Sequence, residues 1–104
     1  LGAGKTTFVQ HWLRQAGYSG VVQSPTYALM NEYYIGQQTV IHADLYRLAA
    51  PDELLYLDVR DWSERATHIF IEWAQNGGDY LPAADVFCQF ALRDGRRYLS
   101  VAAA

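Results

Sequence analysis

The sequence predicts one α/β domain over residues 1–104, with a mixed, mainly parallel central sheet and an antiparallel hairpin at its C-terminal end. Three observations support this fold class: an amphipathic helical pattern directly after a Gly-rich turn, a short apolar run that ends in an acid, and an Asp-Gly turn between two alternating runs. Short apolar runs are typical of strands buried in parallel sheets, whereas Asp-Gly is typical of two-residue hairpins. The apolar fraction of 51% is sufficient for one folded core.

The first predicted element is a helix over residues 5–17. Its apolar residues, Val9, Trp12, Leu13 and Ala16, recur at i, i+3, i+4 and i+7, while polar residues occupy the other face. Gly17 is typical of a helix C-terminus, because glycine adopts the left-handed conformation that ends many helices. The helix therefore has one face to bury.

Two β-rich runs follow, at residues 27–35 and 39–46. The intervening Gly36-Gln37-Gln38 predicts that they form a hairpin. The neighbouring Tyr33 and Tyr34 are interpreted as core and sheet-face residues rather than as a platform for stacking bases.

A second helix is predicted over residues 51–65, with a break near Asp58. Pro51 suits the first helical position, since it needs no backbone N–H there, and acids follow it in the first turn, where they complement the helix dipole. Residues 67–73 then predict a strand, and the continuous apolar run Ile69-Phe70-Ile71 indicates that it is buried on both faces.

Residues 74–82 contain Gly77-Gly78 and predict a loop. The last two strands are predicted at residues 85–93 and 96–101, joined by Asp94-Gly95. Cys88 lies on the alternating apolar face of the first of these strands, so it is interpreted as a buried core thiol. A single cysteine also excludes an internal disulfide.

The Gly-rich turn at residues 1–7, Leu-Gly-Ala-Gly-Lys-Thr-Thr, has the closing half of a phosphate-binding P-loop. Gly2 and Gly4 leave backbone N–H groups free to form an anion nest, and the helix behind them points its positive end at the phosphates. Lys5 would reach the β- and γ-phosphates, and the Thr6 hydroxyl would bind Mg²⁺. The alternative is an ordinary Gly-rich turn before a helix.

Two features of the chain bear on this interpretation. Lys5 is the only lysine among 104 residues, while seven arginines provide the other basic groups. A lone lysine within a phosphate-loop motif is therefore interpreted as a phosphate ligand rather than as an ordinary surface charge. The first glycine of the motif and the strand that feeds it are missing from this sequence, which also lacks an initiator Met. We therefore expect the domain to be N-terminally incomplete.

Two acids complete the predicted nucleotide site. Glu72 ends the apolar run that begins at His68, as the acid of a Walker B strand does, and would orient water or hold Mg²⁺. Asp44 lies two residues after His42, so the two side chains share a strand face and could form a metal pair, or simply a solvated face. Two carboxylates about 4 Å apart repel by about 4 kcal/mol at an effective dielectric of 20, so both acids in one site require a cation.

Charge and hydropathy exclude several classes of partner. The net charge is −3 and the arginines are scattered, which argues against a protein that grips nucleic acid by itself. No apolar run approaches the length of about 20 residues that a membrane helix needs, and no signal peptide is visible.

Four segments in order resemble one family: residues 1–7, Ser24-Pro25-Thr26-Tyr27, the run His42-Ala43-Asp44-Leu45-Tyr46-Arg47-Leu48, and Ile71-Glu72-Trp73. Together they resemble bacterial TsaE, formerly YjeE, over essentially the whole chain. The resemblance implies a cytoplasmic P-loop ATPase that uses ATP and Mg²⁺, releases ADP, and works with TsaD and TsaB to make threonylcarbamoyladenosine beside the anticodon of tRNAs that read codons beginning with A. It implies that tRNA is reached through the complex.

The resemblance also implies roles for individual residues. Lys5, Asp44 and Glu72 would be catalytic, and Thr6, Asp44 and Glu72 would hold Mg²⁺. The nucleotide would be bound by the loop residues together with a switch-like threonine and the residue after Glu72: Gly2, Ala3, Gly4, Lys5, Thr6, Thr7, Thr26 and Trp73. The family often has proline after the tryptophan, whereas Ala74 follows here.

Two rival functions use the same loop. A small-molecule kinase would need an acceptor pocket and an arginine-bearing lid, and Arg47, Arg60 and Arg65 form no recognisable lid pattern. A non-hydrolysing module would use nucleotide only to set its shape for a protein partner. Phosphate transferred to an added small molecule would favour the first, and ATP-dependent docking without phosphate release would favour the second.

Overall fold

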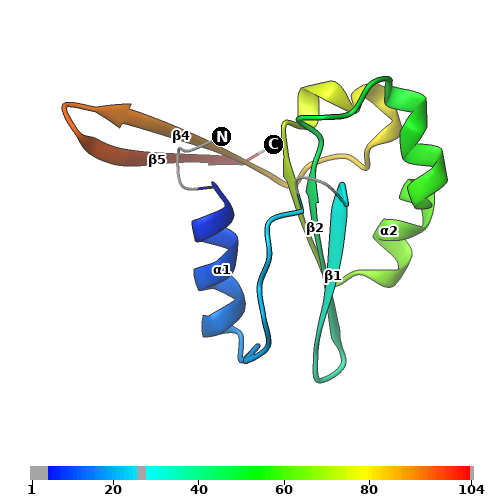
Figure 1. Cartoon of the computed structure of the whole chain (residues 1–104), viewed down its shortest axis with the longest axis horizontal. Coiled ribbons are helices and arrows are strands. Elements are labelled where there is room, and N and C mark those ends of the chain that lie inside the picture. The colour runs from blue at the N-terminus through cyan, green and yellow to red at the C-terminus, as the bar shows by residue number, and fades with distance from the viewer. Residues whose placement is uncertain (1–4, 26–27, 104) are drawn as a thin grey trace.

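The computed structural model describes residues 5–25 and 28–103 as a small sheet with a helix on each face and a hairpin that projects away from it (Figure 1). In chain order the elements are α1 Lys5–Gln15, β1 Met30–Ile35, β2 Gln38–Asp44, the 3₁₀-helix η1 Pro51–Leu57, α2 Val59–Arg65, β3 His68–Glu72, the 3₁₀-helices η2 Ala74–Asn76 and η3 Gly78–Tyr80, β4 Val86–Arg93 and β5 Arg96–Ala103. Among these described residues no helix is long and apolar enough to cross a membrane.

The main sheet has the strand order β1-β2-β3. The strands β1 and β2 form the predicted antiparallel hairpin, and Gly36 in its turn has a φ of 58°, which glycine adopts without strain. The pairing of β2 with β3 is parallel and places Asp44 opposite Glu72. The sheet is mixed, as predicted, but one pairing of each kind replaces the mainly parallel arrangement within the described residues.

One face of the sheet packs against α1. The buried residues of this core are Val9, Leu13, Tyr33 and Val40. Aromatic rings of α1 extend it over β3, since the Phe70 ring lies 6.4 Å from that of Phe8 and 5.0 Å from that of Trp12, both edge to face. The predicted helix over residues 5–17 is confirmed as Lys5–Gln15, and Gly17 follows it with a φ of 106°.

The opposite face packs against η1 and α2. Its buried core consists of Ile41, Ala43, Leu45, Leu54, Val59 and Trp62. The predicted break near Asp58 is confirmed, because this residue has left-handed backbone angles between the two helices. The first segment is a 3₁₀-helix rather than an α-helix. Its three-residue period places Leu54 and Leu57 on the core side, and the turn at Asp58 lets Val59 continue the same core.

An ion-pair network fastens α2 to β1. The Arg65 guanidinium bonds to the carboxylates of Glu32 and, at 3.1 Å, Asp61. Glu32 also accepts a hydrogen bond of 2.8 Å from the Tyr34 hydroxyl. The hydrogen bond to Glu32 raises the pKa of both Tyr34 and Arg65. This network lies on the α2 side of the sheet, away from the face that α1 covers.

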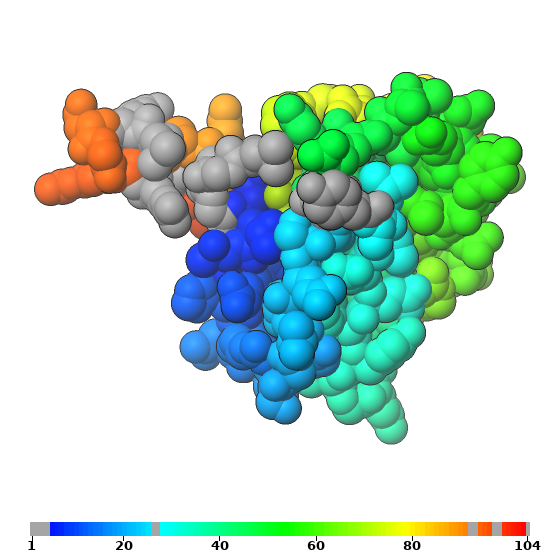
Figure 2. Space-filling model, in the orientation of Figure 1, coloured from blue at the N-terminus to red at the C-terminus, as the bar shows by residue number. Residues whose placement is uncertain are grey.

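Two predictions about strand burial are wrong. The strand β3 is only half-buried, with His68 exposed, because it forms the edge of the described three-stranded sheet. Cys88 is exposed, because β4 and β5 form a separate two-stranded sheet that projects from the body (Figures 1 and 2). Phe90 does reach the body, where its ring lies 5.7 Å from that of Phe8. Alternation predicted the hairpin correctly but could not predict what covers each face.

Candidate active site at the carboxyl ends of the parallel strands

Three polar side chains are buried on the α1 face of the sheet, where β2 and β3 end. His42 is 0% exposed, Asp44 1% and Glu72 8%. They share this face because His42 and Asp44 are two apart on β2, and Glu72 is the register partner of Asp44 on β3. Thr6, in the first turn of α1, bonds to Glu72, so the positive end of the helix lies beside this carboxyl group.

Glu72 is the centre of the hydrogen bonding in this site. Its Oε2 atom lies 2.5 Å from His42 Nε2 and accepts a hydrogen bond of 3.2 Å from the Thr6 hydroxyl. The described residues provide no partner for its Oε1 atom. Side chains from α1 and β2 therefore meet on one oxygen of the Glu72 carboxylate, while the second oxygen remains available.

Asp44 is held by backbone groups on both sides. Its Oδ1 accepts a hydrogen bond of 3.0 Å from the Tyr46 N–H, and its own N–H donates to the Leu29 carbonyl at 2.9 Å. Leu29 has a φ of 67°, a conformation that non-glycine residues seldom adopt. Two acids are thus fixed side by side in a nearly dry setting, which favours a cation between or beside them.

Lys5 and Trp73 form the rim of the site. The Lys5 ammonium nitrogen lies 4.7 Å from the centre of the Trp73 ring, a cation–π contact. Trp73 has a φ of 57°, and its indole Nε1 is buried without a hydrogen-bond partner among the described residues. The Tyr46 ring packs against the Trp73 ring at 5.0 Å. Strained backbone and an unsatisfied donor at one residue are typical of functional sites.

The loop after Trp73 is tied back to β2. Asn76 donates a side-chain hydrogen bond of 2.9 Å to the Leu45 carbonyl, and the Leu45 N–H donates to the Glu72 carbonyl at 3.0 Å. Gly77 packs so closely that an added Cβ would lie 2.7 Å from a Leu81 side-chain atom. These contacts fix the direction in which the chain leaves Glu72 and so hold the Trp73 ring over the site.

The residues predicted from sequence converge only in part within the described chain. Lys5, Thr6, Asp44, Glu72 and Trp73 come together at this edge of the sheet. Thr7 is exposed on the first turn of α1. The predicted binding residues Gly2, Ala3, Gly4 and Thr26 lie outside the described residues.

The contact that sequence reasoning missed is the one between His42 and Glu72. The sequence predicts His42 only together with Asp44, as a metal pair or as a solvated strand face, and the full burial of His42 contradicts the solvated face. In the parallel register His42 lies opposite Phe70, so Glu72 is its diagonal neighbour two residues further along β3. The register of β2 against β3 would predict this pair, but the sequence of neither strand determines that register by itself.

The fit of a divalent cation can be judged from these side chains. In the described part of the chain no group of three His, Cys, Asp or Glu side chains could hold a metal ion. Thr6 and the two acids provide hard oxygen atoms, which suit Mg²⁺ when phosphates and waters complete its shell. The donor set thus fits a cation that arrives with a phosphate ligand, and not a resident protein-only metal.

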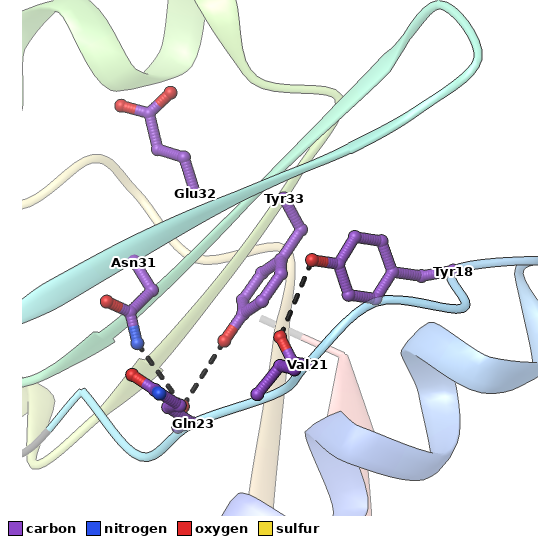
Figure 3. Close-up of a pocket in the computed structure, with 6 residues that line it drawn as sticks. All are labelled: Tyr18, Val21, Gln23, Asn31, Glu32 and Tyr33. Atoms are coloured by element: carbon purple, nitrogen blue, oxygen red, sulfur yellow. Dashed lines mark hydrogen bonds between the residues drawn. The ribbon is translucent and has the colours of Figure 1, made fainter.

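A hollow lies along the connection between α1 and β1. It has a volume of about 280 Å³ and is lined by Tyr18, Val21, Gln23, Asn31, Glu32 and Tyr33. Figure 3 shows the Glu32 side chain on the other side of β1 from the rest. We call this hollow the connection groove.

The polar groups of the connection groove bond to one another. Asn31 Nδ2 and the Tyr33 hydroxyl both donate to the Gln23 carbonyl at 3.2 Å, and the Tyr18 hydroxyl lies 3.5 Å from the Val21 carbonyl (Figure 3). The Tyr18 and Tyr33 rings meet edge to face at 5.1 Å. Two donors on β1 thus share the Gln23 carbonyl, and these bonds fasten the connection to β1.

Fold and site together define a small mixed α/β domain whose polar site lies at the carboxyl edge of parallel strands, beneath a helix N-terminus. Comparison with known proteins identifies the family. The sequence model of the family described as "Threonylcarbamoyl adenosine biosynthesis protein TsaE" matches residues 1–98, so the chain belongs to the TsaE family.

Individual relatives agree with this assignment. The chain is 41% identical over 103 residues to a Haemophilus influenzae protein named "tRNA threonylcarbamoyladenosine biosynthesis protein TsaE", a match that covers 99% of this chain and 65% of the relative. A Treponema pallidum protein of the same name is 32% identical, with 98% of this chain and 76% of that protein covered. The crystal structure of Bacillus subtilis YdiB superposes with a TM-score of 0.67 at 25% identity and covers 98% of this chain and 62% of that one.

Proposed function

We propose that this chain is the ATP-binding and ATP-hydrolysing part of a TsaE protein that acts in threonylcarbamoyladenosine synthesis on tRNA. The observation that carries the proposal is the 3.2 Å hydrogen bond between Thr6, at the start of α1, and Glu72, at the end of β3. P-loop enzymes bring these two positions together, because the hydroxyl and the acid act on the same Mg²⁺ and phosphate group.

The predicted site residues that the structure brings together at the strand ends each have a role in this proposal. Lys5, released from the Trp73 ring, would bind the β- and γ-phosphates, and the backbone amides at the start of α1 would add positive potential. Thr6, Asp44 and Glu72 would hold Mg²⁺ directly or through water, and the ion would offset the charge that develops on the phosphates. Glu72 would also orient the attacking water through its available oxygen, and Trp73 would cover the nucleotide.

The partners we propose are proteins. TsaD and TsaB would form the assembly on which this domain acts, and tRNA would be reached through that assembly in the cytoplasm. The net charge of −3 supports this, since a chain that held tRNA alone would need a basic footprint. The loop amides and Thr26 would sense the γ-phosphate and so couple hydrolysis to the state of the complex.

Phosphate release from ATP, measured with and without TsaB–TsaD and tRNA, tests the proposal. We expect Mg²⁺-dependent release of free phosphate that rises when the partners are present. Phosphate appearing on an added small molecule would instead indicate a kinase. Docking to TsaB–TsaD that requires ATP but releases no phosphate would indicate a non-hydrolysing module.

A further inference from the structure

We propose that His42 is a positioning residue for ATP hydrolysis, which fixes the Glu72 carboxylate through an Nε2–H···Oε2 hydrogen bond; this inference rests on the proposed function. The evidence is a contact of 2.5 Å between two buried side chains, with His42 fully inaccessible to solvent. An apolar residue at position 42 would cover the sheet equally well, so packing alone does not explain a histidine there.

The chemistry of the pair assigns the donor. An ionised carboxylate only accepts hydrogen bonds, so Nε2 must carry the proton. In a neutral imidazole Nδ1 is then a lone pair, and Nδ1 is buried with no partner among the described residues. Leaving an acceptor unpaired in a buried site costs free energy, which a leucine at this position would avoid. The role of the histidine is therefore the hydrogen bond that Nε2–H donates to Glu72.

The two bonds to Oε2 determine which oxygen of Glu72 remains. His42 and Thr6 both point at Oε2, from β2 and from α1, and fix the carboxylate rotation. Oε1 is the oxygen left for water or for metal-bound water. Without His42, the carboxylate would be held by Thr6 alone, and Thr6 is the residue that nucleotide binding would engage.

Three substitutions test the role in the full-length protein with TsaB–TsaD. His42→Leu removes the donor, His42→Gln places an amide N–H where Nε2 was, and His11→Gln is the matched control on the exposed face of α1. Losing a side chain that orients a metal-site ligand typically lowers activity about 10- to 100-fold. We expect that fall in kcat for His42→Leu with less than about threefold change in nucleotide affinity, and recovery of most activity in His42→Gln.

A second measurement does not depend on hydrolysis. Nitrogen-15 NMR of the imidazole should show the Nε2–H tautomer for His42, with a strongly downfield proton that moves upfield in Glu72→Gln. The Nδ1–H tautomer would overturn the proposal, as would wild-type kcat in His42→Leu or equal losses in both His42 variants. A wild-type protein that hydrolyses no ATP would refute the proposed function, whereas the tautomer would still decide whether His42 holds Glu72.

Discussion

The carboxyl-edge site and the connection groove lie on the same face of the sheet and differ in how their polar groups are satisfied. The groove has a volume of about 280 Å³ and aromatic walls, and three of its donors bond to backbone carbonyls of the connection itself, two of them to that of Gln23. At the carboxyl-edge site, His42 Nδ1 and Trp73 Nε1 are buried and have no hydrogen-bond partner among residues 5–25 and 28–103. A buried polar atom without a partner costs free energy unless a ligand or a water satisfies it, so this difference makes the carboxyl-edge site the first place to test for ligand binding.

The strongest test of this contrast is Glu72→Ala. Removing a group that orients or activates water typically lowers a rate about 10²- to 10⁴-fold. We expect hydrolysis to fall by that factor, while ATP binding is largely kept because Lys5 remains. Phosphate release in the presence of TsaB–TsaD measures the rate, and Glu64→Ala, on the exposed face of α2, is the control. Wild-type turnover in Glu72→Ala would remove Glu72 from the mechanism.

A smaller effect is expected from Asp44→Asn. The amide oxygen can still accept the hydrogen bond from the Tyr46 N–H, so the fold should persist. The loss of charge beside the proposed cation should lower hydrolysis about 10- to 100-fold and raise the Mg²⁺ concentration needed for half-maximal rate. Asp52→Asn, on the exposed side of η1, provides the comparison. An unchanged Mg²⁺ requirement would place Asp44 outside the metal site.

The smallest effect is expected in the groove. Tyr33→Phe removes one of the two donors to the Gln23 carbonyl and should lower the free energy of unfolding by about 0.5–1.5 kcal/mol. Hydrolysis should change little, because Asn31 still holds the same carbonyl. Urea unfolding and phosphate release measure the two quantities, with Tyr56→Phe as the control, since the Tyr56 side chain is exposed on η1. A large loss of activity without loss of stability would show that the groove has a functional role.

The sequence predicted much of this arrangement because the informative signals are local. Gly17, Gly36 and Asp94-Gly95 each specify a turn through their own backbone preferences, and the structure has all three turns. Lys5, Thr6 and Glu72 were predicted from spacing alone, and the structure brings them together.

The errors concern contacts between distant segments. Cys88 has the alternation of a buried strand face, but its burial depends on what packs against the hairpin, which the strand itself does not encode. The bond between His42 and Glu72 depends on the register of two parallel strands joined through a long crossover. Burial and register both depend on packing between elements, and sequence patterns within one element predict them only weakly.

The central claim is that nucleotide binds at the carboxyl-edge site and not in the connection groove. Calorimetric titration of Mg²⁺–ATP into wild type, Lys5→Ala and Asn31→Ala tests it most directly, since one substitution removes a polar group from the carboxyl-edge site and the other removes one from the groove. We expect Lys5→Ala to weaken binding by at least about tenfold, the loss of a charge-assisted contact, and Asn31→Ala to change it by less than about twofold. Unchanged affinity in Lys5→Ala, with weakened affinity in Asn31→Ala, would contradict the claim.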